Sequence, residues 1–247
     1  MFALVVLLNT PTYITDYIFY LNEKYKSLII WGIVTFVLFA LAYMRLALNF
    51  NAPYLDECDY IFVGRALLSG EPWITKTYMF SSDMHLYIYG VADRIFSGEQ
   101  SYLAARACAV LMGTASLWFF YSFVRNFYGG HTDSRRIAEL ATLLLALTVP
   151  HVFISQFATY DIVCFMFFAA SLWLLSASVL NSNQASSQKQ VFIMCAGAAL
   201  YALAVLAKYV VIAYTPLLFM ALFLKNRRAA LIFTLVVAAM LGGYVCF

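Results

Sequence analysis

Long apolar runs recur along the whole chain, and they restrict its fold more than any other feature of the sequence. A helix needs about 20 apolar residues to cross the hydrocarbon core of a bilayer. Hydrophobic residues make up 64% of the 247 residues and charged residues only 11%, a composition outside the range of soluble globular domains. We therefore expect an all-α fold, a polytopic transmembrane helix bundle of about seven spans. The expected spans are residues 27–49, 101–127, 137–153, 161–180, 191–206, 209–224 and 229–247.

The region between the first two spans is the most polar part of the chain. We expect residues 50–100 to form a long extracytoplasmic loop that carries two interfacial helices. One begins near Asp56 and ends at Ser69-Gly70, because glycine commonly terminates a helix. The other runs from about Ser82 to Phe96, and a further interfacial helix is expected over residues 10–26.

Residues 1–247 are expected to form a single transmembrane domain. The last apolar run reaches the final residue without a polar flank, which suggests the N-terminal part of a longer protein. Basic residues fall at alternate turns, and the positive-inside rule places those turns in the cytoplasm. They are Lys24, Lys26, Arg125, Arg135, Arg136, Lys189 and the cluster Lys225–Arg228. The loop 50–100, Asp161 and Lys208 then lie together on the extracytoplasmic side.

Three carboxylates, Asp56, Glu57 and Asp59, follow the first span. In a helix that starts near Asp56, Asp56 and Asp59 share a face with Tyr60, while Glu57 points away. One alternative is that these carboxylates only cap the N-terminus of the helix and have no catalytic role. Carboxylates at a membrane edge are costly unless they are solvated or paired, however, and neighbouring carboxylates raise one another's pKa, which suits a general base. We therefore interpret the cluster as a candidate catalytic site.

Four other residues are candidates for binding a substrate. Asp161 opens a span and either caps it or lines the same outer cavity as the first cluster. Lys208, between two apolar runs, and Arg106 either snorkel to the interface or bind phosphate. His85 lies in the polar loop with no second histidine at metal-ligand spacing. The sequence therefore supports no metal and no cofactor.

The sequence also lacks the motifs of several other enzyme classes. It has no phosphate-binding glycine loop, no GxSxG and no HExxH motif, and its net charge of +3 requires no nucleic-acid partner.

The order of these motifs resembles the GT-C superfamily of membrane glycosyltransferases, in the group of protein O-mannosyltransferases and lipid A aminoarabinose transferases. The resemblance covers roughly residues 30–230. Many relatives carry a Lys-Pro-Pro run where this chain has Asp83-Met84-His85. The matching positions are Asp56-Glu57, Tyr60, Ala66, Gly70, Tyr87-Ile88-Tyr89-Gly90 to Phe96, Ala104-Ala105-Arg106, Ala158-Thr159-Tyr160-Asp161 and Leu203 to Tyr209.

The resemblance implies an integral, multi-pass enzyme of the plasma or inner membrane with an extracytoplasmic active site. Such an enzyme moves a sugar from a polyprenyl-phosphate donor to a hydroxyl of a protein or glycolipid acceptor, with inversion. Asp56 would be the general base, and Glu57 would position the acceptor or tune Asp56. Asp161 and Asp59 would contact acceptor or sugar. Lys208, Arg106 and His85 would stabilise the departing lipid phosphate.

Two other functions stay open from the sequence. A transporter or flippase would use intramembrane carboxylates and would show buried charges, broken helices and repeat symmetry. A non-catalytic binding subunit is the third alternative.

Overall fold

The computed structural model describes residues 34–48, 55–71, 82–96, 101–180 and 187–246. Every element in these ranges is a helix, which confirms the all-α prediction. The helix Val34–Leu48 comes first. The elements that follow are α3 (Leu55–Leu68), α4 (Met84–Ile95), α5 (Ser101–Phe127), α6 (Ser134–Leu147), α7 (Val149–Gln156), α8 (Tyr160–Leu180), α9 (Ser187–Ala207), the 3-10 helix η3 (Tyr209–Tyr214), α10 (Thr215–Lys225) and α11 (Arg227–Cys246).

The chain divides into two compact units, Met1–Leu41 and Ala42–Phe247. In the first unit only residues 34–41 are described, and they are helical. The helix expected over residues 10–26 and the basic residues Lys24 and Lys26 lie outside the described residues. All contacts discussed below are within the second unit.

Among the described residues, four helices are long and apolar enough to cross a membrane: α5, α8, α9 and α11. The pair α6 and α7 makes a fifth candidate if it is counted as one span. Two shorter apolar helices, Val34–Leu48 and Tyr209–Lys225, occupy the places where the sequence predicts the remaining spans. Several long apolar helices of this kind define an integral membrane protein.

The segment expected as one continuous span over residues 137–153 is instead broken, because α6 and α7 meet at an angle of 63°. Thr148 between them has extended backbone. Pro150 has no N–H to donate to the carbonyl of Ala146, four residues earlier, and its ring crowds that carbonyl in a straight helix. The Tyr43 hydroxyl lies 3.1 Å from the Ala146 oxygen and donates to it. The break therefore leaves this carbonyl satisfied inside the protein.

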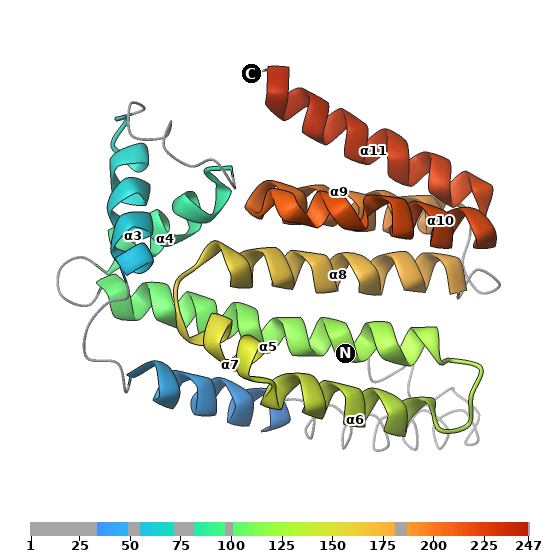
Figure 1. Cartoon of the computed structure of the whole chain (residues 1–247), viewed down its shortest axis with the longest axis horizontal. Helices are drawn as coiled ribbons and strands as arrows, with labels where there is room; N and C mark the ends of the chain where they lie inside the picture. Colours follow the sequence, from blue (N-terminus) through green and yellow to red (C-terminus); the bar gives the residue numbers. More distant parts are fainter. Residues whose placement is uncertain (1–33, 49–54, 72–81, 97–100, 181–186, 247) are drawn as a thin grey trace, which may run out of the picture. The chain divides into compact units, whose positions relative to one another are not determined.

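The long helices form a layered bundle in which α8 lies between α5 and α9, and α11 packs on the other side of α9 (Figure 1). Small buried side chains let these helices approach closely, as is typical of membrane bundles. Ala109 on α5, Ala170 on α8 and Ala198 on α9 are all buried. The Ser171 hydroxyl donates to the Gly197 carbonyl at 2.8 Å and joins α8 to α9.

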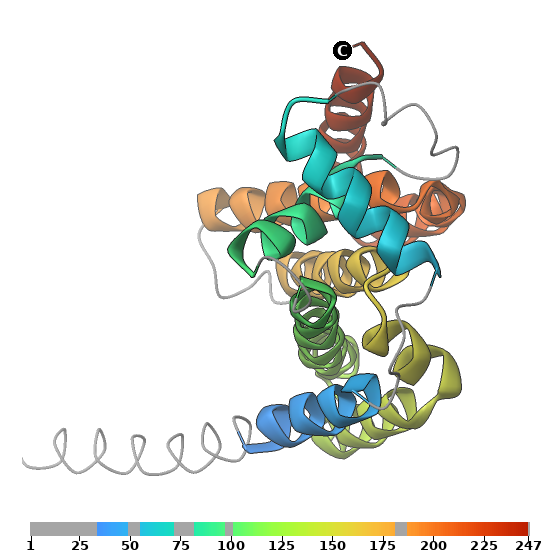
Figure 2. The ribbon, with the colours of Figure 1, turned by 90° about the vertical axis from the view of Figure 1, so that its left-hand side faces the viewer.

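The two predicted loop helices, α3 and α4, lie across one end of this bundle (Figures 1 and 2). Gly70, with φ +81°, follows α3 and ends it as predicted. The two helices cross with backbone against backbone: a Cβ added at Gly64 would lie 2.3 Å from the Leu86 oxygen, and one at Gly90 would lie 2.5 Å from Gly64. The α5–α6 and α10–α11 turns lie at the opposite end of the bundle (Figure 1). This end, which carries the basic turns, is called the basic end below.

Candidate functional site

Glu57 and Arg106 form a buried ion pair where α3 meets α5. Arg106 Nε lies 3.0 and 3.2 Å from the two Glu57 carboxylate oxygens, and Nη2 lies 2.8 Å from Oε2. Arg106 also donates to the Ala47 carbonyl at 2.9 Å, and the Ala158 backbone N–H donates to Glu57 Oε1 at 2.8 Å. Both side chains are fully buried. The pair thus ties together four segments of the chain, and the structure places both residues inside the protein.

The other two acids of the cluster face outward from the first turn of α3. Asp56 is half-buried and Asp59 is exposed, whereas Tyr60 is buried. The helical repeat places Asp56 one turn before Tyr60, on the same side of α3. Glu57 is rotated away from that side and points into the bundle. Asp56 therefore lies on the Tyr60 side of α3 and is only partly exposed, whereas Asp59 is exposed.

Three aromatic rings from α3, α4 and α8 meet at Tyr60. The Tyr60 ring lies 4.7 Å from His85 and 5.7 Å from Tyr160, and His85 lies 5.6 Å from Tyr160, measured between centroids. His85 is fully buried, and this burial lowers its pKa to about 4. The imidazole is therefore neutral at physiological pH. The imidazole ring packs edge-on against the Tyr60 and Tyr160 rings.

Asp161 and Lys208 form another ion pair at this end of the bundle. Lys208 Nζ donates to Asp161 Oδ1 and lies 4.9 Å from the centroid of the Tyr160 ring. About a third of each side chain is exposed, 30% for Lys208 and 32% for Asp161. Lys208 has extended backbone between α9 and η3. Unlike the buried pair, this pair can meet a ligand from solvent.

Two hydrogen bonds to backbone carbonyls hold the helices of the candidate site together. The Ser82 N–H donates to the Leu206 carbonyl at 2.7 Å and joins the start of α4 to the end of α9. The Tyr89 hydroxyl donates to the Thr159 carbonyl at 2.8 Å and joins α4 to the segment that leads into α8. The acidic end of α3, the start of α8 and Lys208 are therefore held at the same end of the bundle.

The structure joins some of the residues that the sequence singles out and separates others. It pairs Asp161 with Lys208, and it pairs Glu57 with Arg106, which the sequence does not predict. His85 contacts the ring next to Asp161, while Asp59 is exposed. Tyr160 is not among the residues predicted to form the site, although its position directly before Asp161 in the sequence could have indicated it. In the described part of the chain, no group of three or more His, Cys, Asp or Glu side chains could hold a metal ion.

Within the described residues, this end of the all-helical membrane bundle carries three acid–base ion pairs: Glu57–Arg106, Asp161–Lys208 and Asp93–Arg65, the last of which joins α3 to α4. The sequence profile of dolichyl-phosphate-mannose-protein mannosyltransferases matches residues 82–247, and the chain belongs to this family. The family is one of mannosyltransferases, and the match includes Arg106, Asp161 and Lys208. It begins after α3, so Asp56 and Glu57 lie outside the matched residues. No curated protein and no solved structure matched the chain significantly.

Proposed function

We propose that this protein transfers a sugar from a polyprenyl-phosphate donor to a hydroxyl of a protein or glycolipid acceptor, with inversion, on the extracytoplasmic side. The observation that supports this proposal is that the partly exposed Asp161–Lys208 pair contacts the Tyr160 ring, which lies 5.7 Å from the ring of Tyr60, the residue one helical turn after Asp56. A general base and a cation that faces a leaving phosphate are the two groups that such a transfer requires.

In this proposal Asp56 is the general base. It accepts the proton of the acceptor hydroxyl while the hydroxyl oxygen attacks the anomeric carbon of the sugar. Glu57 is less suited to this step, because Arg106 and the Ala158 N–H already occupy its carboxylate oxygens. We assign Glu57 and Arg106 the role of positioning the first turn of α3, and we assign Asp59 to the exposed approach of the acceptor.

Lys208 stabilises the leaving group in this proposal. The bond between the anomeric carbon and the phosphate oxygen breaks, and the electron pair stays on the lipid phosphate. An ammonium group that is already oriented offsets the developing negative charge without reorganisation. Asp161 holds Lys208 in place before the donor binds, and its second oxygen is suited to accept from a sugar hydroxyl. His85 supports the site through Tyr160.

The test is transfer of radiolabelled sugar from polyprenyl phosphate by membranes that contain the protein. Asp56→Asn is expected to lower the rate by about 10²-fold or more, the usual contribution of a general base. Asp133→Asn is the matched control, since it removes the same charge from an exposed position at the basic end of the bundle and should leave the rate unchanged. Wild-type rates in Asp56→Asn would overturn the base assignment, and no transfer by the wild type would overturn the proposed function.

The broken pair α6 and α7 favours one alternative, a transporter or flippase, because that class uses discontinuous helices. The break is filled by the Tyr43 and His151 side chains, whose hydroxyl and Nδ1 are 3.0 Å apart. A flippase would move the polyprenyl-phosphate sugar between leaflets without cleaving it. Movement of intact donor across vesicles, with no sugar transferred to any acceptor, would favour this alternative.

A further inference from the structure

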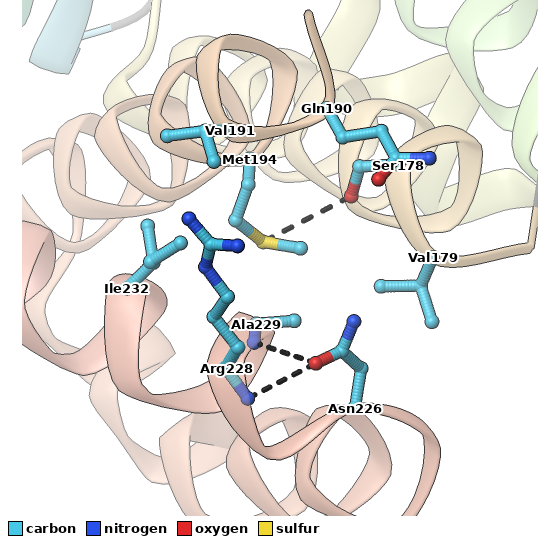
Figure 3. A pocket seen from close by; sticks show the side chains of 9 residues that line it. All are labelled: Ser178, Val179, Gln190, Val191, Met194, Asn226, Arg228, Ala229 and Ile232. Carbon is cyan, nitrogen blue, oxygen red and sulfur yellow. Dashed lines mark hydrogen bonds between the residues drawn. The ribbon is translucent and has the colours of Figure 1, made fainter. Parts of the chain in front are cut away.

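A small cavity lies at the basic end of the bundle, away from the candidate site. It is formed by the end of α8, the start of α9 and the α10–α11 turn (Figure 3). Its volume is about 80 Å³, and its polar lining comes from Ser178, Gln190, Asn226 and Arg228. Pockets that enclose a whole small molecule usually measure about 300–1,000 Å³. The cavity is therefore of a size for one polar group of a larger ligand.

Arg228 gives this cavity its charge. Figure 3 shows its side chain extending from the start of α11 toward Met194 and Ile232. Arg228 forms no ion pair with any carboxylate of the described residues. The Asn226 side chain accepts from the backbone N–H groups of Arg228 and Ala229, at 3.0 and 3.2 Å. Because the start of α11 is already capped, the guanidinium is the group that would bind an anion.

The surroundings of the cavity are basic and apolar at once. Lys225 and Arg227 lie in the same turn, and the acids Asp133 and Glu139 at this end pair with Arg136 and Arg135. Large apolar side chains close in sequence to the lining residues are exposed: Phe192, which follows Val191, by 74%, and Leu224, two residues before Asn226, by 76%. A free phosphate ion would use only the cation, whereas a phospholipid would use the cation for its headgroup and the apolar side chains for its acyl chains.

We propose that this cavity binds the headgroup phosphate of an anionic phospholipid from the leaflet at the basic end. Basic pockets between transmembrane helices at the cytoplasmic face are typical headgroup sites. The cavity lies at the ends of α8 and α9, two of the helices long and apolar enough to cross a membrane. It is separate from the proposed sugar-transfer site and does not depend on it.

The test measures lipid retained by the purified protein, by native mass spectrometry, after exposure to vesicles of phosphatidylcholine with or without phosphatidylglycerol. Arg228→Gln is expected to lower the affinity for phosphatidylglycerol about fivefold, which corresponds to about 1 kcal/mol. Arg228→Lys, which keeps the charge, is expected to stay within about twofold. Arg227→Gln is the matched control, because the Arg227 guanidinium lies 5.4 Å from the Phe223 ring and does not line the cavity.

Three outcomes would overturn this proposal. Equal losses in Arg228→Gln and Arg227→Gln would show diffuse attraction to an anionic surface. Displacement of the lipid by inorganic phosphate at matched concentration would show a phosphate site without lipid specificity. Equal retention of phosphatidylcholine and phosphatidylglycerol by the wild type would show no anion selectivity, and this measurement does not depend on any variant folding.

Discussion

The Arg106 guanidinium contacts both carboxylate oxygens of Glu57 in a fully buried pair that also reaches Ala47 and Ala158. Two charges are removed from water here, and their desolvation offsets much of their attraction. The main contribution of the pair is to hold α3 in position. Its hydrogen bonds fix the first turn of α3, and therefore Asp56, relative to α5 and to the segment before α8.

Removing one partner of this pair should be strongly destabilising. Arg106→Met leaves the Glu57 carboxylate buried without its cation, and we expect a loss of about 3–5 kcal/mol in the free energy of unfolding. Arg135→Met is the matched control, because Arg135 pairs with Glu139 at 2.7 Å on an exposed surface. Its loss should be about 0.5 kcal/mol or less. Denaturant unfolding in detergent micelles measures both, and equal losses would contradict the structural role of Arg106.

Lys208 should matter for binding of the donor phosphate. A hydrogen bond to a charged group contributes about 1.5–3 kcal/mol, so Lys208→Ala is expected to weaken donor binding about 10-fold or more. Lys225→Ala removes the same charge at the basic end and should leave donor binding unchanged. Isothermal titration with a short-chain polyprenyl-phosphate sugar measures both variants. Undiminished binding by Lys208→Ala would remove this residue from the proposed site.

The α3–α4 crossing should not accept a single methyl group. Gly64→Ala places a Cβ against the Leu86 carbonyl and the Gly90 backbone, which cannot move independently of α4. We expect a loss of about 1–3 kcal/mol from overpacking. Gly130→Ala is the control, since nothing lies within 4 Å of a Cβ at that position. Thermal unfolding should distinguish the two variants; a tolerated Gly64→Ala would show that the helices are further apart.

His85 should make stability depend on pH. Burial lowers its pKa to about 4, from an ordinary value of 6.5, so the folded protein keeps it neutral where the unfolded chain is protonated. The unfolded chain therefore takes up a proton as the pH falls from about 6.5 toward 4, and stability decreases over that range. Above about 6.5 this contribution is constant.

His85→Gln removes this titration, so its unfolding temperature should fall less steeply than that of the wild type between pH 6.5 and 4. His131→Gln, at an exposed position, should leave the slope of the wild type. If His85→Gln and the wild type show the same slope, the imidazole is not held neutral by its surroundings.

Local signals in the sequence predict where the helices lie along the chain, but they do not predict which segments pack against one another. Hydropathy predicts α5 at its observed bounds, Ser101–Phe127, and glycine at position 70 predicts the end of α3. The break between α6 and α7 is only partly visible in Pro150, because the hydroxyl that stabilises it comes from Tyr43, which is 103 residues from Ala146. Segments that contact across such separations leave no periodic pattern in the sequence.

The candidate site shows the same difference between what the sequence predicts and what it does not. The side on which Asp161 and Lys208 lie follows from counting spans, and the structure brings the two side chains into contact across 47 residues. The pairing of Glu57 with Arg106 depends on how α3 is rotated against α5, which helix propensity alone does not determine. The sequence therefore identifies the charged residues but not which of them is buried.

The contact between Gly64 and Gly90 has a mechanical consequence. The two backbones touch here without a side chain between them, and the Arg65 guanidinium donates to both carboxylate oxygens of Asp93 at 2.7 and 2.6 Å, so α3 and α4 are expected to move together. Since the Ser82 N–H is bonded to Leu206, two residues before Lys208, any tilt that uncovers Asp56 also pulls on the segment that carries the lysine. Admission of an acceptor and alignment of the cation would then be one motion.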